Sequence, residues 1–405
     1  MTARAPRERP LAHQALLLAA ATGTAQVLVA VLYLLAARGV EPAEFGATVS
    51  AIALGTAAAG FIDFGTNNHW TRELARKAMP DQLFEDRLFS KLVYTITAAG
   101  GWALLCLLFL PQSHVWLAGP ITAALVINQA YQVRLRSAAR GELVALVILC
   151  DRVAATMLFA GMSLAGVDAP VALWAALTAG SLAAAVIARR LGGVRKGGIR
   201  PRLTNPWSGA HFFGLGVVAN SAQALDLTIL SAVAGSTAAG VYGAVNRWTQ
   251  PMALLAAAFS SALAPYAARS STLSEAWGQL RRALWMPLGA IGVSIAVFFA
   301  APFVVDLLLG RAYEDSSATL QVLALVVIPS IICQPLVVIL QSFKRDRFVA
   351  GVMITAALGQ LMLVLVLGGS SGALGAAQAA LAAQIFILLA LVGGTIHLGR
   401  STLKE

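Results

Sequence analysis

Residues 189–207 read RRLGGVRKGGIRPRLTNPW and divide the 405-residue chain into two long apolar parts. The segment holds six Lys or Arg residues together with glycines and prolines, a composition typical of a flexible linker. On each side of it, apolar runs alternate with short polar stretches. Runs of about 20 apolar residues are long enough to cross a bilayer as helices. We therefore expect a linker at 189–209 between two helical membrane lobes, 1–188 (the N-terminal lobe) and 210–405 (the C-terminal lobe).

The overall composition excludes a water-soluble protein. Hydrophobic residues make up 59% of the chain and charged residues only 12%, against about 25% charged in an ordinary soluble domain. So few charged groups cannot cover the surface of a soluble protein of this size. The net charge of +11 would suit nucleic acid only if the cations shared one soluble face, but they lie between apolar runs. We expect an all-α polytopic membrane protein with no nucleic-acid partner.

The apolar runs predict twelve transmembrane helices, six in each lobe. In the N-terminal lobe the predicted spans are 14–37, 45–64, 89–110, 115–132, 143–165 and 169–188. In the C-terminal lobe they are 210–233, 238–265, 283–308, 318–341, 347–368 and 373–397. The span at 115–132 is the least apolar, because it ends in the polar stretch INQAYQVRLR.

The distribution of basic residues tests this topology independently of the apolar runs. With the N-terminus inside, 25 of the 29 Lys and Arg residues lie on the inner side. Arg38 and Arg311 lie outside, and Arg152 and Arg247 lie within spans. Lys and Arg favour cytoplasmic loops, so this bias predicts that both termini are cytoplasmic. Losing any one span would invert every later loop and destroy the bias.

The two lobes show a weak internal repeat. GVEPAEFGATVS at 39–50 aligns with GSTAAGVYGAVN at 235–246, which places Phe45-Gly46 on Tyr242-Gly243. Two lobes of six spans in the same orientation form a parallel repeat about an axis along the membrane normal. In proteins built this way the substrate site lies between the repeats, so we expect a central cavity.

Charged residues inside spans are costly and usually face a cavity or a partner. Arg247 and Asp226 lie at similar predicted depths in the spans 238–265 and 210–233, so they could form an interhelical ion pair, and Arg247 could also face the cavity. Asn220, Gln223 and Asp226 recur every three residues on one side of a helix. Such a polar arc either lines water or joins helices, and we favour lining.

The first span carries Gln26 in a weaker polar stripe with Thr22 and Tyr33, and it has no cation. We therefore expect the stripe to line the cavity, and the cavity to be less basic than one for strongly anionic head groups.

Four further polar residues leave more than one reading open. Asp151 and Arg152 are adjacent, so each is expected to need a separate partner, and we place Arg152 in the cavity. Asp63 ends the second span and Asn67 follows one turn later. Asp63 could cap the segment that follows it or pair with Arg72, or Asp63, Asn67 and Asp151 could act in an inner gate or in ion coupling. No Cys or His pattern has metal-site spacing, so we expect neither metal nor cofactor.

Several motifs resemble the family of bacterial polysaccharide or O-antigen flippases. LLAARGVEPAEFGATVSAIAL (34–54) and FIDFGTNNHWTRELAR (61–76) are similar to the start of these proteins. LDLTILSAVAGSTAAGVYGAVNRW (225–248) and SSALAPYAAR (260–269) resemble their seventh and eighth spans. LLLGRAYEDSSATLQVLAL (307–325) resembles the stretch between their ninth and tenth spans. The family belongs to the multidrug, oligosaccharidyl-lipid and polysaccharide exporter (MOP) superfamily.

The resemblance implies a flippase that moves a polyprenyl-diphosphate-linked oligosaccharide to the outer leaflet of the bacterial inner membrane by alternating access. It implies lipids, a coupling ion (H⁺ or Na⁺) and polysaccharide polymerase machinery as partners, and no enzyme activity. The main alternative is an ion-coupled multidrug antiporter of the same superfamily. A polymerase or ligase is disfavoured because the predicted outer loops are short, and a membrane scaffold would need a dry interface between the lobes.

Overall fold

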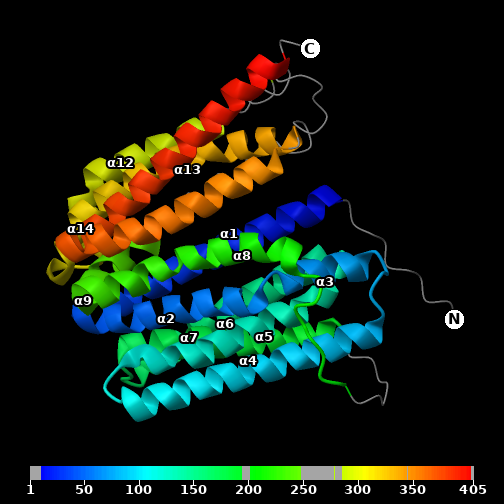
Figure 1. The fold of residues 1–405 in the computed structure, drawn as a ribbon. Coiled ribbons are helices and arrows are strands. Elements are labelled where there is room, and N and C mark those ends of the chain that lie inside the picture. Colours follow the sequence, from blue (N-terminus) through cyan, green and yellow to red (C-terminus); the bar gives the residue numbers. More distant parts are fainter. Residues whose placement is uncertain (1–10, 194–200, 248–277, 279–284, 344, 403–405) are drawn as a thin grey trace.

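The computed structural model describes residues 11–193, 201–247, 278, 285–343 and 345–402, and these form a bundle of roughly parallel helices (Figure 1). No strand occurs among them. The N-terminal lobe contains α1 (Leu11–Ala37), α2 (Pro42–Asp63), α3 (Thr66–Ala75), α4 (Asp81–Phe109), η1 (His114–Leu117), α5 (Ala118–Ser137), α6 (Gly141–Leu164) and α7 (Ala169–Leu191). The C-terminal lobe contains α8 (His211–Gln223), α9 (Leu225–Asn246), α12 (Trp285–Leu308), η3 (Arg311–Tyr313), α13 (Ser316–Ser342) and α14 (Asp346–Thr402).

Nine helices in the described part of the chain are long and apolar enough to cross a membrane. The helix α5 is not among them, although it occupies the position of the predicted span 115–132. Its second half carries Asn128, Gln132, Arg134 and Arg136, which lower its hydropathy below that of a spanning helix. The rest of the prediction for this segment, a helix, is confirmed.

Two of the nine helices contain a break at a glycine. Gly235 interrupts α9 with φ 86° and ψ 167°, between the predicted spans 210–233 and 238–265. Gly372 interrupts α14 with φ 58° and ψ −134°, between the predicted spans 347–368 and 373–397. Positive φ is accessible to glycine because it has no Cβ atom. Most of the predicted span 238–265 lies outside the described residues.

The two parts of α14 fold back on each other. A Cβ atom at Gly394, near the end of α14, would lie 2.5 Å from the ring of Phe348, near its beginning. Val349, Val352 and Ala356 of the first part share an apolar cluster with Ile387 and Leu391 of the second. Residues 346–402 therefore form a helical hairpin, which packs on α13 through the same cluster (Figure 1).

The lobes meet where α2 of the N-terminal lobe packs on α8 and α9. Near the end of α2, Gly60 leaves room for Ser221, whose Oγ would lie 1.7 Å from a Cβ atom at position 60. Midway along α2, Thr228 Oγ1 donates a hydrogen bond to Ser50 O at 3.1 Å. Near its start, Gly46 and Gly240 bring the two backbones together. Helix α2 is thus in contact with this pair of helices from end to end.

The bundle has two ends that we name by a feature at each. At the α3 end, α1 begins, α14 finishes and α3 is located (Figure 1). At the Gly235 end, α1 finishes, α2 begins and α9 turns. The charge bias predicts that the α3 end faces the cytoplasm, and that orientation stays a prediction.

Candidate functional site

A cavity of about 1340 Å³ lies between the lobes. Its walls come from α1, α2, α8 and α9 on one side and from α13 and α14 on the other. Asn68, Gln341 and Arg347 line it toward the α3 end, while Asp226 and Tyr242 line its deeper part. A space of this size in a membrane protein gives polar groups on the wall access to water.

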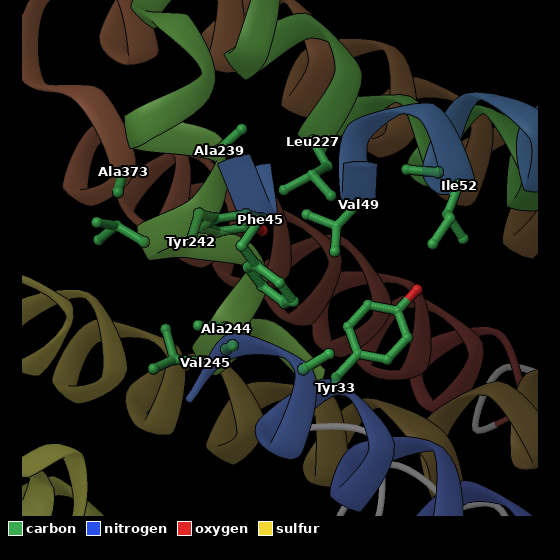
Figure 2. Packing of buried hydrophobic residues seen from close by; sticks show 14 of the residues in the cluster. Tyr33, Phe45, Val49, Ile52, Leu227, Ala239, Tyr242, Ala244, Val245 and Ala373 are labelled. Carbon is green, nitrogen blue, oxygen red and sulfur yellow. The ribbon is translucent and has the colours of Figure 1, made fainter. Parts of the chain in front are cut away.

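The Gly235 end of the cavity is closed by backbone contact and by aromatic rings. A Cβ atom at Gly46 would lie 1.8 Å from Ser236 O, and one at Gly240 would lie 1.8 Å from Pro42 O. Phe45 is fully buried between the rings of Tyr33 and Tyr313, with centroid distances of 6.3 Å and 6.4 Å. Figure 2 shows Phe45 in this cluster beside Tyr33 and Tyr242. The described residues therefore leave the α3 end as the open side.

Arg247 lies at the end of α9 and lines the cavity. Its Nη2 donates a hydrogen bond to Tyr33 Oη at 3.3 Å, and its guanidinium lies 4.7 Å from the centroid of the Tyr33 ring. A guanidinium held over an aromatic face keeps its charge and retains donors for another partner. Arg247 is thus a fixed cation on the cavity wall, supported by a residue of the other lobe.

The predicted ion pair between Asp226 and Arg247 is wrong. No described salt bridge joins them, because the Asp226 carboxylate turns to other donors. It accepts a hydrogen bond from Tyr242 Oη at 2.9 Å and from the backbone N of Leu227 at 2.6 Å. The break at Gly235 brings Tyr242 back beside Asp226, and equal predicted depth on separate spans could not reveal that partner.

The other predicted cavity residues fall into three groups. Gln26 and Gln223 line the cavity. Asn220 lies on α8, but its side chain is outside the described part of the structure. Arg152 is not on the cavity wall, and its Nη1 lies 3.7 Å from Asp151 Oδ1. The expectation of a separate partner is wrong for Arg152, because its long side chain bends back to the preceding carboxylate, and it is confirmed for Asp151, which also accepts hydrogen bonds from Asn128 and Ser181.

Asp151 belongs to a polar chain inside the N-terminal lobe. Asn128 Nδ2 donates to Asp151 Oδ2 at 3.0 Å, and Ser181 Oγ donates to the same oxygen at 3.3 Å. Gln132 Nε2 then donates to Asn128 Oδ1 at 2.9 Å, and Arg136 Nη2 donates to Gln132 Oε1 at 3.1 Å. The chain joins α5, α6 and α7 and lies away from the cavity wall. A gating or coupling role for Asp151 stays a prediction.

Asp63 and Asn67 surround the ammonium of Lys91, which is fully buried in α4. Lys91 Nζ lies 2.5 Å from Asp63 Oδ1 and 3.1 Å from Asn67 Oδ1. It also donates to Thr66 Oγ1 at 2.6 Å and lies 5.1 Å from the centroid of the Trp70 ring. The charge is fully paired and hydrogen-bonded, as a buried ion requires.

The predicted pairing of Asp63 with Arg72 is therefore wrong, whereas the alternative, capping, is confirmed: at the start of α3, Asp63 Oδ1 accepts hydrogen bonds from the backbone N of Asn67 at 3.2 Å and from Thr66 Oγ1 at 2.9 Å. The sequence reading counted Lys91 among the loop cations, whereas α4 begins at Asp81 and carries Lys91 into the bundle. A gating role for Asp63 and Asn67 stays a prediction.

Sequence reasoning missed most of the polar wall of the C-terminal lobe. The residues it missed there are Gln334, Gln341, Arg347, Gln360 and Gln384. Gln334 and Gln341 are seven residues apart, or two turns of α13, and so share one face. That spacing could have signalled a polar stripe. Gln360 and Gln384 stand alone in apolar runs, and only the hairpin of α14 brings them to one cavity.

The described residues hold no group of His, Cys, Asp and Glu side chains that could bind a metal ion. The cavity wall offers hydrogen-bonding amides and two guanidinium groups. Such a set can bind and orient a polar molecule.

No family model matches the sequence, and no curated protein matches it. Solved structures do match. The lipid II flippase MurJ in an inward closed conformation superimposes with a TM-score of 0.74 at 14% identity, covering 94% of this chain and 87% of that chain.

An inward-facing multidrug resistance MATE family transporter of the MOP superfamily matches with a TM-score of 0.65 at 15% identity, over 94% of each chain. A MOP superfamily transporter from Pyrococcus furiosus matches with a TM-score of 0.51 at 16% identity, over 98% of this chain and 95% of that one. At these identities the matches show a common fold.

Proposed function

We propose that this chain, a multi-pass helical membrane protein with the fold of the MOP superfamily transporters, is a flippase for a polyprenyl-diphosphate-linked oligosaccharide. The observation that carries the proposal is the cavity of about 1340 Å³ between the lobes, with Arg247 on its wall. Pockets for drug-sized ligands measure about 300–1,000 Å³, so this one suits a larger polar head.

The physical task explains why such a cavity is needed. Moving a sugar head through hydrocarbon without hydrogen-bond partners is prohibitive. A cavity with polar walls replaces those partners, while the polyprenyl tail stays in the surrounding lipid. The guanidinium of Arg247 supplies the charge and the paired donors that a diphosphate binds. No bond breaks in this process, so the protein needs no catalytic group.

The closed Gly235 end supports transport by alternating access. In this conformation the described residues leave the cavity open at the α3 end, and the α2–α9 contact and the Phe45 cluster block it at the Gly235 end. Release on the far side requires that contact to part. We infer a layout of twelve spans in two parallel repeats, with both termini in the cytoplasm of a bacterium, so that the α3 end faces the lipid-linked substrate where it is made.

An ion-coupled multidrug antiporter is the second candidate, and Asp226 favours it. This carboxylate is buried at the deep part of the cavity, where a cation or proton could bind. The matched MATE structure is a multidrug resistance transporter. The cavity of about 1340 Å³ exceeds the usual size of a pocket for a drug-sized ligand, and its wall carries the fixed cation Arg247, so we favour the flippase.

The test compares flipping of a labelled lipid-linked oligosaccharide in vesicles that contain wild type or Arg247→Ala. We expect the variant to lose most of the flipping activity while inserting normally, because the diphosphate loses its cation. Arg38→Ala is the matched control, since Arg38 is exposed at the Gly235 end and should not affect transport. Normal flipping by Arg247→Ala would remove Arg247 from the site, and gradient-driven export of a cationic drug without lipid flipping would establish the antiporter.

A further inference from the structure

Six glutamine side chains line the cavity and face it from both walls. They are Gln26 on α1, Gln223 on α8, Gln334 and Gln341 on α13, and Gln360 and Gln384 on α14. None of the six side chains makes a hydrogen bond to another residue in the part of the chain that the structure describes. The amides are therefore open to a ligand.

Gln360 is the clearest case. Its side chain lies in the middle of an apolar helix and the residue is only 9% exposed, and it lines the cavity. Burying an amide without a partner is costly, so native proteins pair nearly all buried polar groups. Here the only space that its amide can reach among the described residues is the cavity. Water or a ligand in that space therefore supplies the hydrogen bonds of this amide.

Three buried or half-buried amides away from the cavity are paired within the protein, unlike the cavity group. Asn128 in the N-terminal lobe donates to Asp151 and accepts from Gln132. Gln321 on α13, off the cavity wall, donates to Phe298 O at 3.3 Å. These amides have protein partners, whereas the side chains of the six glutamines on the cavity wall have none among the described residues.

The chemistry of the wall indicates the charge of its ligand. Each glutamine offers two N–H donors and a carbonyl acceptor without net charge, which matches sugar hydroxyls that both donate and accept. The cations on the described wall are Arg247 and Arg347, and its one carboxylate, Asp226, is held by Tyr242. A head group with several acidic sugars would need more cations than these, because buried charges must be paired.

We propose that the six glutamines form a binding subsite for an uncharged oligosaccharide, so that the transported lipid carries a neutral glycan. The inference rests on the proposed function, and it adds the class of glycan and the residues that select it. Arg247 holds the diphosphate, and the glutamines hold the sugars from both walls.

The experiment measures binding to the full-length protein in nanodiscs. The probes are polyprenyl diphosphate alone, the same lipid with a neutral trisaccharide, and the same lipid with a trisaccharide that contains uronic acids. The variants are Gln360→Leu, Gln384→Leu and the double variant, because leucine approximates the volume of glutamine and cannot form hydrogen bonds. Gln321→Leu is the matched control, since Gln321 lies on α13 off the cavity wall.

Wild type is expected to prefer the neutral trisaccharide lipid to the acidic one. A lost neutral hydrogen bond weakens binding about two- to tenfold, so each single variant should lose about fivefold and the double variant at least tenfold. Binding of the diphosphate lipid without sugar should change less than twofold. The two single variants act at separate positions, so the measurement survives if one of them fails to fold.

The inference fails if the double variant binds the neutral trisaccharide lipid as wild type does, or if wild type prefers the acidic probe. A soluble neutral trisaccharide separates this failure from failure of the flippase proposal. If wild type binds none of the lipid probes but binds the free sugar in a Gln360-dependent way, the flippase proposal fails and the sugar subsite stands. If it binds neither kind of probe, both are overturned.

Discussion

Substituting Gly240 by alanine should open the closed end of the cavity. A Cβ atom at Gly240 would lie 1.8 Å from Pro42 O and 2.6 Å from its carbonyl carbon. Ordinary contacts of a Cβ atom begin at about 3.4 Å, so α2 and α9 must separate by about 1.6 Å. Because both groups belong to backbones, no side chain can turn aside. Forcing a methyl group into a packed contact costs about 1–3 kcal/mol.

The added methyl group destabilises the closed conformation, in which α2 and α9 touch at Gly240. It does not destabilise a conformation in which the Gly235 end is open. About 2 kcal/mol shifts such an equilibrium roughly 30-fold toward the open conformation. The assay is the rate at which a membrane-impermeant maleimide, added at the Gly235 end, labels Val49→Cys in a background without Cys106, Cys150 and Cys333. Val49 is 1% exposed in the closed state, so its labelling reports opening.

Gly23→Ala is the matched control for this measurement. Gly23 lies in α1, and a Cβ atom there would have no neighbour within 4 Å. We expect it to leave the labelling rate at Val49→Cys unchanged, whereas Gly240→Ala raises it about 10- to 100-fold. Equal rates in Gly240→Ala and Gly23→Ala, with both proteins folded, would refute the view that the glycine contact holds this end shut.

Three further results are expected. Lys91→Met should lower the free energy of unfolding, measured by thermal unfolding in detergent, by about 3–5 kcal/mol, because it leaves the Asp63 carboxylate buried without its cation. Adding Asp63→Asn should recover part of this loss, and no recovery would contradict the pairing of Lys91 with Asp63. Tyr242→Phe should cost about 1–3 kcal/mol by the same measurement, because the buried Asp226 loses a donor, and a smaller loss in an Asp226→Asn background would confirm the coupling. Burial and nearby cations lower the pKa of His69 on α3 below 6.5, so the folded state binds fewer protons there than the unfolded state. The free energy of unfolding should therefore fall as the pH drops from 6.5 toward that lower pKa. His69→Gln should flatten this dependence of the free energy of unfolding on pH, and an unchanged dependence would exclude His69 as its source.

The sequence predicts a helical membrane protein because apolar length and charge are properties of each segment alone. Predictions from the sequence are wrong for residues whose environment is set by contacts with distant segments of the chain. Lys91 illustrates this, because a lysine at the start of an apolar run reads as a loop cation until Asp63, Thr66 and Asn67 are seen around it. The corner that assembles these residues is set by the left-handed backbone of Phe64 and Gly65, which no periodicity reports.

The candidate site was predictable where one helix carries the pattern. Gln26, Gln223, Asp226 and Arg247 were chosen as rare polar groups in spans, and all four line the cavity. Their role in substrate binding stays a prediction. The opposite wall was missed because its residues come from α13 and from both parts of α14, and their convergence depends on the turn at Gly372.

The polar chain through α5 has a consequence for biosynthesis. Asn128 finds a partner outside α5 only in Asp151 of α6, which Ser181 of α7 also binds, and both of these residues are translated later. Until then the Asn128 amide lacks that partner, and α5 is not apolar enough to count among the spanning helices. We therefore expect α5 to become stably inserted only once α6 and α7 have followed it.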